Sequence, residues 1–199
     1  GALTRVETAA VGDTPATATE FDYDLMGRAR KHRQWIAGQQ YDLEYTYNLA
    51  GQLTSEKYPS GRIMTMGYDA NGRMSSISDA NRTYLSGLQY QQIGGAVSAL
   101  TLGNGIQQAF EYNDRLQMKK IAWTKNNSVI QRFDYSFGQI DPQSGSVDTT
   151  KNNGQLAQVE SYIGGSASSP TKQFTQKFSY DSIGRLETEN EYRGDNGNQ

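Results

Sequence analysis

The sequence contains no cysteine, one histidine and only four prolines among its 199 residues. Without cysteine the chain can form neither a disulfide framework nor a metal or nucleophile site that depends on a thiolate. The single histidine, His32, lies in a basic, polar stretch, which argues against a histidine-based triad and against a His-rich metal site. We therefore predict no catalytic residue, no bound metal and no cofactor, and we expect His32 to lie on a solvated strand.

Charge of one sign and long hydrophobic runs are also lacking. The 19 basic and 21 acidic residues give a net charge of −2, which provides no broad basic field for nucleic acid. No stretch approaches the ~18 consecutive apolar residues of a membrane span, and the N-terminus lacks the basic-then-apolar order of a signal peptide. From the net charge we expect no binding to nucleic acid. The chain begins at Gly1, so we interpret it as a segment of a longer protein.

Glycine and tyrosine are abundant instead, with 21 and 13 residues. Glycine supplies the positive φ of tight turns, and tyrosine suits a half-buried pleated face. This composition predicts an all-β protein with many short strands.

One pattern recurs along the chain: an aromatic or apolar residue, any residue, Tyr, then Asp or Asn, and shortly afterwards Gly-Arg or Gly-Gln with an apolar residue. Clear copies lie at 21–28, 45–53, 66–74 and 178–186, and weaker ones at 88–90, 110–116 and 133–135. The predicted repeat anchors are the tyrosines Tyr23, Tyr47, Tyr68, Tyr90, Tyr112, Tyr135 and Tyr180 and the turn glycines Gly27, Gly51, Gly72 and Gly184. The period is about 22 residues.

Each repeat has the features of a β-hairpin. Phe178 and Tyr180 are two residues apart, so in a strand they project from one face, which we expect to be the buried one. The Asp or Asn that follows the Tyr accepts hydrogen bonds from turn amides, and the Gly closes the turn in a left-handed conformation. Because one hairpin is only marginally stable in water, neighbouring repeats must supply the rest of the core in an antiparallel sheet.

The spacing also divides the chain. We predict an N-terminal lead-in at 1–20, a repeat domain of about seven hairpins at 21–190 and a flexible tail at 191–199. Two loop insertions are expected in the sixth repeat, near 136–153 and at the Gly/Ser-rich stretch 163–171.

The repeats resemble the YD repeats of bacterial Rhs proteins, of the C component of insecticidal Tc toxins, of wall-associated proteins and of the teneurins. The resemblance implies an all-β arc of a hollow, spiral β-shell that encloses or scaffolds a C-terminal cargo domain. It further implies a structural, non-enzymatic part of a secreted or cell-surface protein of the polymorphic-toxin type, whose partners are neighbouring repeats and the cargo. Residues 140–146 match only the first half of a family motif for self-cleavage, so we interpret Asp141-Pro142 as a turn.

An alternative is a carbohydrate- or protein-binding module that acts through exposed loops and aromatic rings, since sugars stack on such rings. Most tyrosines are needed as repeat anchors, so the candidate ligand contacts are Trp35, Trp123 and Tyr162. The basic stretch 28–33 is expected at an exposed edge that resists aggregation. Open strand edges also predict edge-to-edge self-association.

Overall fold

A computed structural model of the chain describes residues 2–11 and 16–194. These residues are built almost entirely from antiparallel β-strands, and their only helical element is a 3-10 turn at Thr149–Lys151. The prediction of an all-β chain of consecutive antiparallel hairpins is therefore confirmed. The chain divides into two compact units, Gly1–Ser86 and Gly87–Gln199, and β8 (Thr83–Tyr90) crosses the boundary between them.

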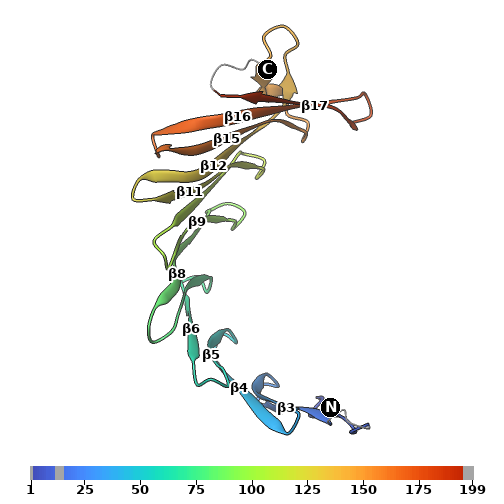
Figure 1. Cartoon of the computed structure of the whole chain (residues 1–199), viewed down its shortest axis with the longest axis vertical. Coiled ribbons are helices and arrows are strands. Elements are labelled where there is room, and N and C mark those ends of the chain that lie inside the picture. The colour runs from blue at the N-terminus through green and yellow to red at the C-terminus, as the bar shows by residue number, and fades with distance from the viewer. Residues whose placement is uncertain (1, 12–15, 195–199) are drawn as a thin grey trace. The chain divides into compact units, whose positions relative to one another are not determined.

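In the first unit β1 pairs antiparallel with β2, and every later strand pairs with the strand before it and the strand after it (Figure 1). Its strands are β1 (Arg5–Thr8), β2 (Thr17–Tyr23), β3 (Ala29–Ile36), β4 (Gln39–Tyr47), β5 (Leu53–Lys57), β6 (Ile63–Tyr68) and β7 (Met74–Ser78). The anchor tyrosines Tyr23, Tyr47 and Tyr68 are each the last residue of a strand.

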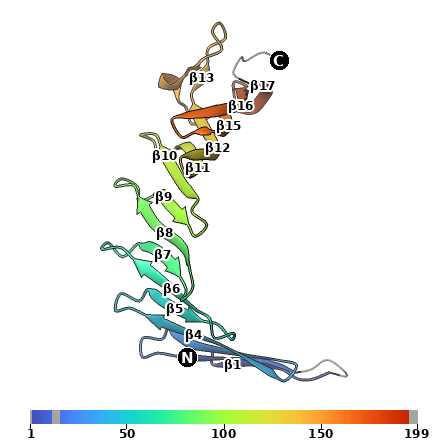
Figure 2. The same ribbon diagram turned by 60° about the vertical axis from the view of Figure 1, so that its left-hand side comes forward.

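The second unit has the same hairpin order, and its longest strands are β12, β15 and β16 (Figure 2). Its sheet strands are β9 (Val97–Leu102), β10 (Gln107–Tyr112), β11 (Met118–Lys125), β12 (Ser128–Phe137), β15 (Leu156–Ser166), β16 (Ser169–Tyr180) and β17 (Leu186–Arg193). Between β12 and β15 the chain forms a small separate hairpin of β13 (Gln139–Ile140) and β14 (Val147–Asp148).

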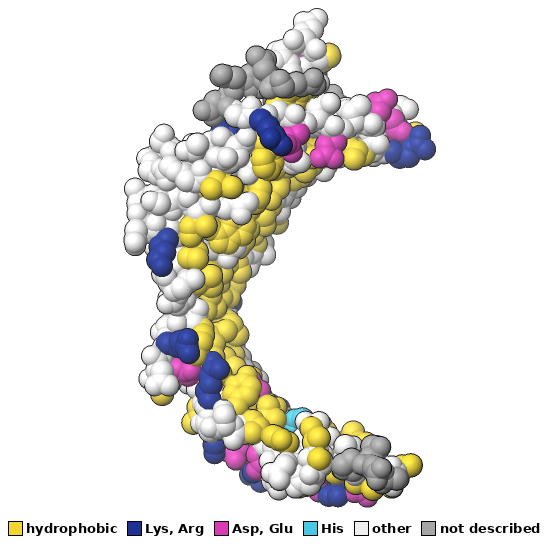
Figure 3. Space-filling model, in the orientation of Figure 1, with side chains coloured by type: hydrophobic (Ala, Val, Ile, Leu, Met, Phe, Trp, Pro, Cys, Tyr) yellow, Lys and Arg dark blue, Asp and Glu magenta, His cyan; other side chains and the backbone are white. Residues whose placement is uncertain are grey.

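One face of the sheet is apolar in each unit, because every second residue of a strand projects to the same side. In the first unit His32 is in register with Phe21 on one side and Leu43 on the other, and its ring stacks on Phe21 at 4.8 Å. In the second unit Ile121 lies between Phe110 and Phe133 in the same way. Figure 3 shows hydrophobic side chains in a stripe along both units.

The opposite face of the first unit carries ion pairs across the strands. Arg33 on β3 contacts Asp22 on β2 at 2.5 Å, and Lys31 contacts Asp42 on β4 at 2.8 Å. The basic stretch 28–33 therefore lies inside the sheet, between acidic partners, and not at an exposed edge as predicted. The prediction of a solvated His32 also fails, because strand alternation places it among apolar side chains with a buried Nε2.

The two predicted loop insertions differ from each other in structure. Residues 163–171 lie in the paired ends of β15 and β16, with Ser166 opposite Ser169, so this stretch extends a hairpin where a flexible loop was predicted. Two register shifts lie between Ser161 and Gly165, where the consecutive residues Gly164 and Gly165 have φ 76° and 74°. Residues 136–153 do leave the sheet, but they contain the β13–β14 hairpin and the 3-10 turn.

The predicted lead-in and tail are partly strands. Residues 5–8 form β1 and residues 17–20 belong to β2, so pairing begins before residue 21. At the other end β17 runs to Arg193, and the Gly194 amide donates to the Gln173 carbonyl at 2.9 Å. Residues 195–199 of the predicted tail lie outside the described residues.

Few side chains are fully enclosed. The buried hydrophobic residues among those described are Ala122, Val129, Ala157 and Val159, all in the second unit. Ser161 is 1% exposed, lies in register between Phe133 and Phe174, and has a hydroxyl with no hydrogen-bond partner.

Ser161→Ala is expected to raise the free energy of unfolding by about 1 kcal/mol, because it removes a buried hydroxyl that makes no hydrogen bond. Urea denaturation followed by tryptophan fluorescence measures the change. Ser182→Ala, at an exposed turn position, is the matched control and should leave stability unchanged. A loss of stability on Ser161→Ala would show that the hydroxyl contributes a favourable contact.

Candidate functional site: the seam between repeats

The turn of each repeat is held by the residue that follows the anchor tyrosine. Asp24 accepts hydrogen bonds from the amides of Met26 and Arg28 at 2.9 Å, and its second oxygen accepts from the Arg28 Nε at 2.7 Å. Gly27 has φ 78° and donates its amide to the Asp24 carbonyl. The turn therefore requires a short acceptor side chain at its start and a left-handed residue three positions later.

Two side-chain pairings serve this turn. Asp pairs with Arg in the turns of Asp24, Asp69 and Asp181. Asn pairs with Gln in the others: the Asn48 amide donates to the Gln52 Oε1 at 2.7 Å, and Asn113 donates to Gln117 at 2.8 Å. A carboxylate thus faces a guanidinium and an amide faces an amide, so the identities of the two positions are matched within a turn.

Hydrogen bonds lower the pKa of the aspartates in these turns. The largest cause at Asp24, Asp69 and Asp181 is the backbone amide of the paired arginine, and its side chain lowers the pKa further. The folded turn thus favours the ionised carboxylate.

The backbone ladder stops short of this turn edge on the side of the neighbouring repeat. The last paired residue of β3 towards β4 is Lys31, two positions after Ala29, where β3 begins. In β15 the last residue paired to β16 is Gln158, two positions after Leu156. The carbonyls of Ala29 and Leu156 are therefore left without a partner from the ladder.

The anchor tyrosine of the next repeat fills this gap. The Tyr47 hydroxyl donates to the Ala29 carbonyl at 2.7 Å, and the Tyr180 hydroxyl donates to Leu156 at 2.9 Å. The same bond joins Tyr23 to Leu3 at 2.6 Å, Tyr68 to Leu53 at 2.8 Å and Tyr112 to Val97 at 3.1 Å. We call this row of tyrosine-to-carbonyl bonds the seam.

Beside the seam, a second kind of contact joins successive turns. The Arg28 guanidinium donates to the Asn48 carbonyl at 3.3 Å and lies 4.5 Å from the centre of the Tyr47 ring. Gln52 donates to the Gly72 carbonyl of the next turn. A Cβ at Gly72 would lie 3.3 Å from the Gln52 Nε2, so this glycine gives both the positive φ and the room for that contact.

The remaining two anchors are Tyr90 and Tyr135. Tyr90 ends β8, the strand that crosses the unit boundary. Tyr135 is half-buried on β12, its ring is 6.4 Å from that of Phe133, and burial raises its pKa. The chain continues for two more residues in β12 before it enters the β13–β14 hairpin.

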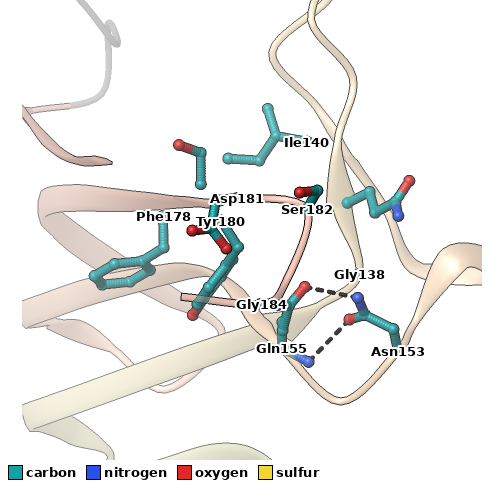
Figure 4. A pocket seen from close by; sticks show the side chains of 11 residues that line it. Gly138, Ile140, Asn153, Gln155, Phe178, Tyr180, Asp181, Ser182 and Gly184 are labelled. Atoms are coloured by element: carbon teal, nitrogen blue, oxygen red, sulfur yellow. Dashed lines mark hydrogen bonds between the residues drawn. The ribbon is translucent and has the colours of Figure 1, made fainter. Parts of the chain in front are cut away.

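That inserted hairpin is fixed at both ends. The Lys177 Nζ donates to the Gly145 carbonyl at 2.7 Å, and the Asn152 amide donates to the Gln117 Oε1 at 2.7 Å. Beside it lies a cleft of about 510 Å³, which Figure 4 shows between the hairpin and the turn after β16. Its lining includes Ile140, Asn153, Gln155, Phe178, Tyr180 and Asp181.

Of the three candidate ligand contacts, Trp35 lies in the first unit, and Trp123 and Tyr162 lie on opposite faces of the second. Trp35 lies on β3 with the Arg5 guanidinium 5.8 Å from its ring. Trp123 packs edge-on against Phe133 at 6.4 Å, on the apolar face of the second unit. Tyr162, in register with Arg132, lies on the other face, donates to Glu160 at 2.7 Å and has a raised pKa, first because of burial.

Sequence reasoning missed Asp79, in the turn between β7 and β8. Its carboxylate accepts from the Tyr84 hydroxyl at 2.6 Å and from the Arg62 Nε at 3.0 Å, and it is 7% exposed. The Tyr84 bond is the largest cause that lowers its pKa to about 2. The only sequence signal is an Asp three residues before Arg82 at a turn.

Neither a metal cluster nor a membrane helix is found in residues 2–11 and 16–194. No group of three or more acidic or histidine side chains there is placed to hold a metal ion. None of the helical structure in that part is long and apolar enough to span a membrane.

The family model of the teneurin YD-shell matches residues 2–101, which is half of the chain. The chain belongs to the teneurin YD-shell family. The resemblance drawn from its repeats is thereby confirmed. No curated protein matches the chain.

Solved structures show the same fold. The crystal structure of TcdB2–TccC3–Cdc42 matches with a TM-score of 0.56 and 14% identity over 88% of this chain. That of TcdB2–TccC3 matches with a TM-score of 0.55 and 14% identity over 90%. The chain covers 11% and 12% of those chains, so it is similar to a small part of each.

The matched pairing within turns predicts coupling between Asp181 and Arg185. Asp181→Asn alone places an amide donor against a guanidinium, and Arg185→Gln alone leaves the carboxylate without its cation. The double variant reproduces the Asn48–Gln52 pair, so it should be more stable than the sum of the two single losses by about 0.5 kcal/mol. Thermal unfolding in a double-mutant cycle measures this, and additivity within error would contradict the pairing rule.

Asp79 predicts acid sensitivity. Its folded pKa of about 2 is below the unfolded value of about 3.9, so its contribution to stability is complete above about pH 5 and is lost as the pH falls towards 2. Asp79→Asn should reduce the dependence of stability on pH between 4 and 2. Urea denaturation at a series of pH values checks this, with Asp114→Asn at an exposed turn position as the control. An unchanged slope would rule Asp79 out as a source of the acid sensitivity.

Proposed function

We propose that this chain is a structural segment of a large secreted or cell-surface protein of the polymorphic-toxin type, in which it forms part of a β-shell that encloses or scaffolds a cargo domain. The observation that supports this most is the seam, in which five of the seven anchor tyrosines make the same bond to the hairpin before them. Such a bond holds neighbouring hairpins together in one continuous sheet, since it joins a hairpin to the one before it. In this role the chain contributes no catalytic residue.

The surface of the sheet supports an enclosed partner. The accessible area is 12903 Å², whereas a compact monomer of 22.1 kDa exposes about 9,300 Å². Within the described residues, the apolar stripe of each unit carries no second layer of strands or helices. We propose that cargo on the C-terminal side of the repeats lies against this face.

The solved structures support the same arrangement by analogy. One of them is TcdB2–TccC3 without its hypervariable C-terminal region, which covers 88% of this chain at a TM-score of 0.55. We carry over to this chain a fold of shell type that is combined with a separate C-terminal region. Secretion or surface display, and a bacterial source, follow from the same analogy.

A second candidate function is the binding of a glycan or a protein partner, and the cleft beside the β13–β14 hairpin favours it. That cleft combines amide, hydroxyl and carboxylate groups with the rings of Phe178 and Tyr180 (Figure 4). Hydroxyl-rich ligands need both kinds of contact. Trp35, Trp123 and Tyr162 remain proposed contacts, each in a different place on the sheet.

The scaffold role predicts protection of cargo in the full-length protein. In limited proteolysis followed by mass spectrometry, the C-terminal region should survive protease concentrations that digest it when it is expressed alone. Weakening the seam with Tyr47→Phe and Tyr180→Phe together should increase its cleavage, because each change removes one bond between hairpins.

Tyr41→Phe, at an exposed position of β4 outside the seam, is the matched control. Equal digestion of the C-terminal region in the full-length protein and alone would refute the scaffold role. A glycan array probed with this chain, with Asn153→Ala as the cleft variant, would then test the second candidate.

A further inference from the structure

Strand β17 has one partner among the described residues. It pairs with β16 through a register that runs from Phe174↔Arg193 to Tyr180↔Leu186. The order of the sheet ends at β17, so its other edge presents a row of backbone groups without a strand beside them. The strands at the equivalent position in earlier repeats indicate which carbonyl and side chains of β17 face this edge.

The Leu186 carbonyl corresponds to the acceptors of the seam. Leu186 pairs with Tyr180 across a bulge, as Ala29 pairs with Tyr23 and Leu53 with Tyr47. The carbonyls of Ala29 and Leu53 point away from their own hairpin and accept the next tyrosine hydroxyl. Since the register is the same, the Leu186 carbonyl points to the outer edge of β17.

Arg185 corresponds to the residue that contacts the next turn. In the first repeat, Arg28 donates to the Asn48 carbonyl and covers the Tyr47 ring, and its side chain is 25% exposed. Arg185 makes the same contact with its own Asp181 but is 76% exposed. Its guanidinium therefore retains free donors at the edge where a further turn would lie.

The acidic side chains of β17 favour basic residues on a strand that pairs with its outer edge. Glu189 and Glu191 are exposed on this strand, three and five positions after Leu186. In the earlier seams these positions face the fourth and sixth residues before the incoming tyrosine, as Val159 faces Gln176 and Ser161 faces Phe174. Opposite charges at directly facing positions stabilise a strand pair, and like charges destabilise it.

We propose that the outer edge of β17 is a docking site for an extended strand that carries Lys or Arg at the fourth and sixth positions before a Tyr-Asx-x-x-Gly turn. Its tyrosine hydroxyl donates to the Leu186 carbonyl, and Arg185 donates to the turn. The glycine leaves room for Arg185. The proposal rests on the scaffold function, because it takes the seam as the element by which a wall is extended through strand addition.

A second copy of this chain is a poorer occupant. Its end strands among the described residues, β1 and β17, contain no anchor tyrosine. The acidic β17 edges of two copies would also repel each other. Edge-to-edge self-association, which we also propose for the isolated chain, is thus expected to be weaker than the binding of a basic strand with the tyrosine turn.

A labelled peptide tests the site. The probe is the segment 39–53 of this chain with Tyr41→Lys and Leu43→Lys, which places lysine six and four positions before Tyr47. Fluorescence anisotropy with the whole chain should show saturable binding. The same peptide with Tyr47→Phe should bind about 2–10-fold more weakly, because it lacks one hydrogen bond, and a peptide with glutamate in place of both lysines should bind more weakly still.

Variants of the chain and hydrogen exchange locate the binding. Arg185→Ala should weaken binding several-fold, whereas Arg30→Ala, which removes the same charge at an exposed position of the first unit, should not. Amides of Leu186–Arg193 should gain protection. No binding at about 1 mM peptide, equal affinity of the Tyr47→Phe peptide, or protection at β1 in place of β17 would overturn the proposal.

Light scattering of the chain without peptide gives the contribution of self-association. A dimer that the peptide does not dissociate would show a second copy at the edge and would likewise overturn the proposal. The scaffold function is judged separately by protection of cargo in the full-length protein, so the two can fail independently.

Discussion

The structure depends on the hydrogen bond that the backbone carbonyl at the start of a return strand accepts from the next anchor tyrosine. The backbone ladder towards the neighbouring repeat ends two residues inside the return strand, at Lys31 in β3 and at Gln158 in β15. A peptide carbonyl without a partner in a partly covered place is costly. The tyrosine hydroxyl reaches further than a backbone amide can, so it restores the bond at the point where the ladder ends. This explains why the repeat is organised around tyrosine and not around phenylalanine.

The hydrogen bonds of the seam are important for stability because few hydrophobic side chains are buried. The described residues include only four buried hydrophobic side chains, and the first unit has none. Its cohesion comes from paired strands, from ion pairs such as Arg33 with Asp22, and from the seam. Half-exposed ion pairs of this kind contribute modestly one at a time, and their value lies in the network that runs across several strands.

Much of this architecture could be predicted from sequence. The period of the Tyr-Asx-x-x-Gly motif predicts hairpins, and the spacing of Phe178 and Tyr180 predicts their shared face. The acceptor of each tyrosine hydroxyl could not be predicted, because every residue has a backbone carbonyl and the residue type does not show which one accepts. His32 was misplaced because the charge of its neighbours suggested solvent, whereas strand alternation puts it beside Phe21. The composition of the Gly/Ser-rich stretch 163–171 predicts a loop, but composition does not report the backbone pairing between β15 and β16 that the structure has there.

The sixth repeat shows how a wall of this kind tolerates an insertion. Its turn is replaced by a hairpin of its own, yet the Asn152 amide joins the Gln117 side chain of the preceding turn, and Gln155 lies against Gly184 of the following one. Gln155 therefore takes the place that Gln52 takes beside Gly72 in a plain repeat. Contacts between successive turns are thus kept on both sides of the insertion, and the residues between them are not needed for those contacts. A cleft can arise there because the continuity of the sheet is secured by the residues that flank it, and not by the hairpin that forms its wall.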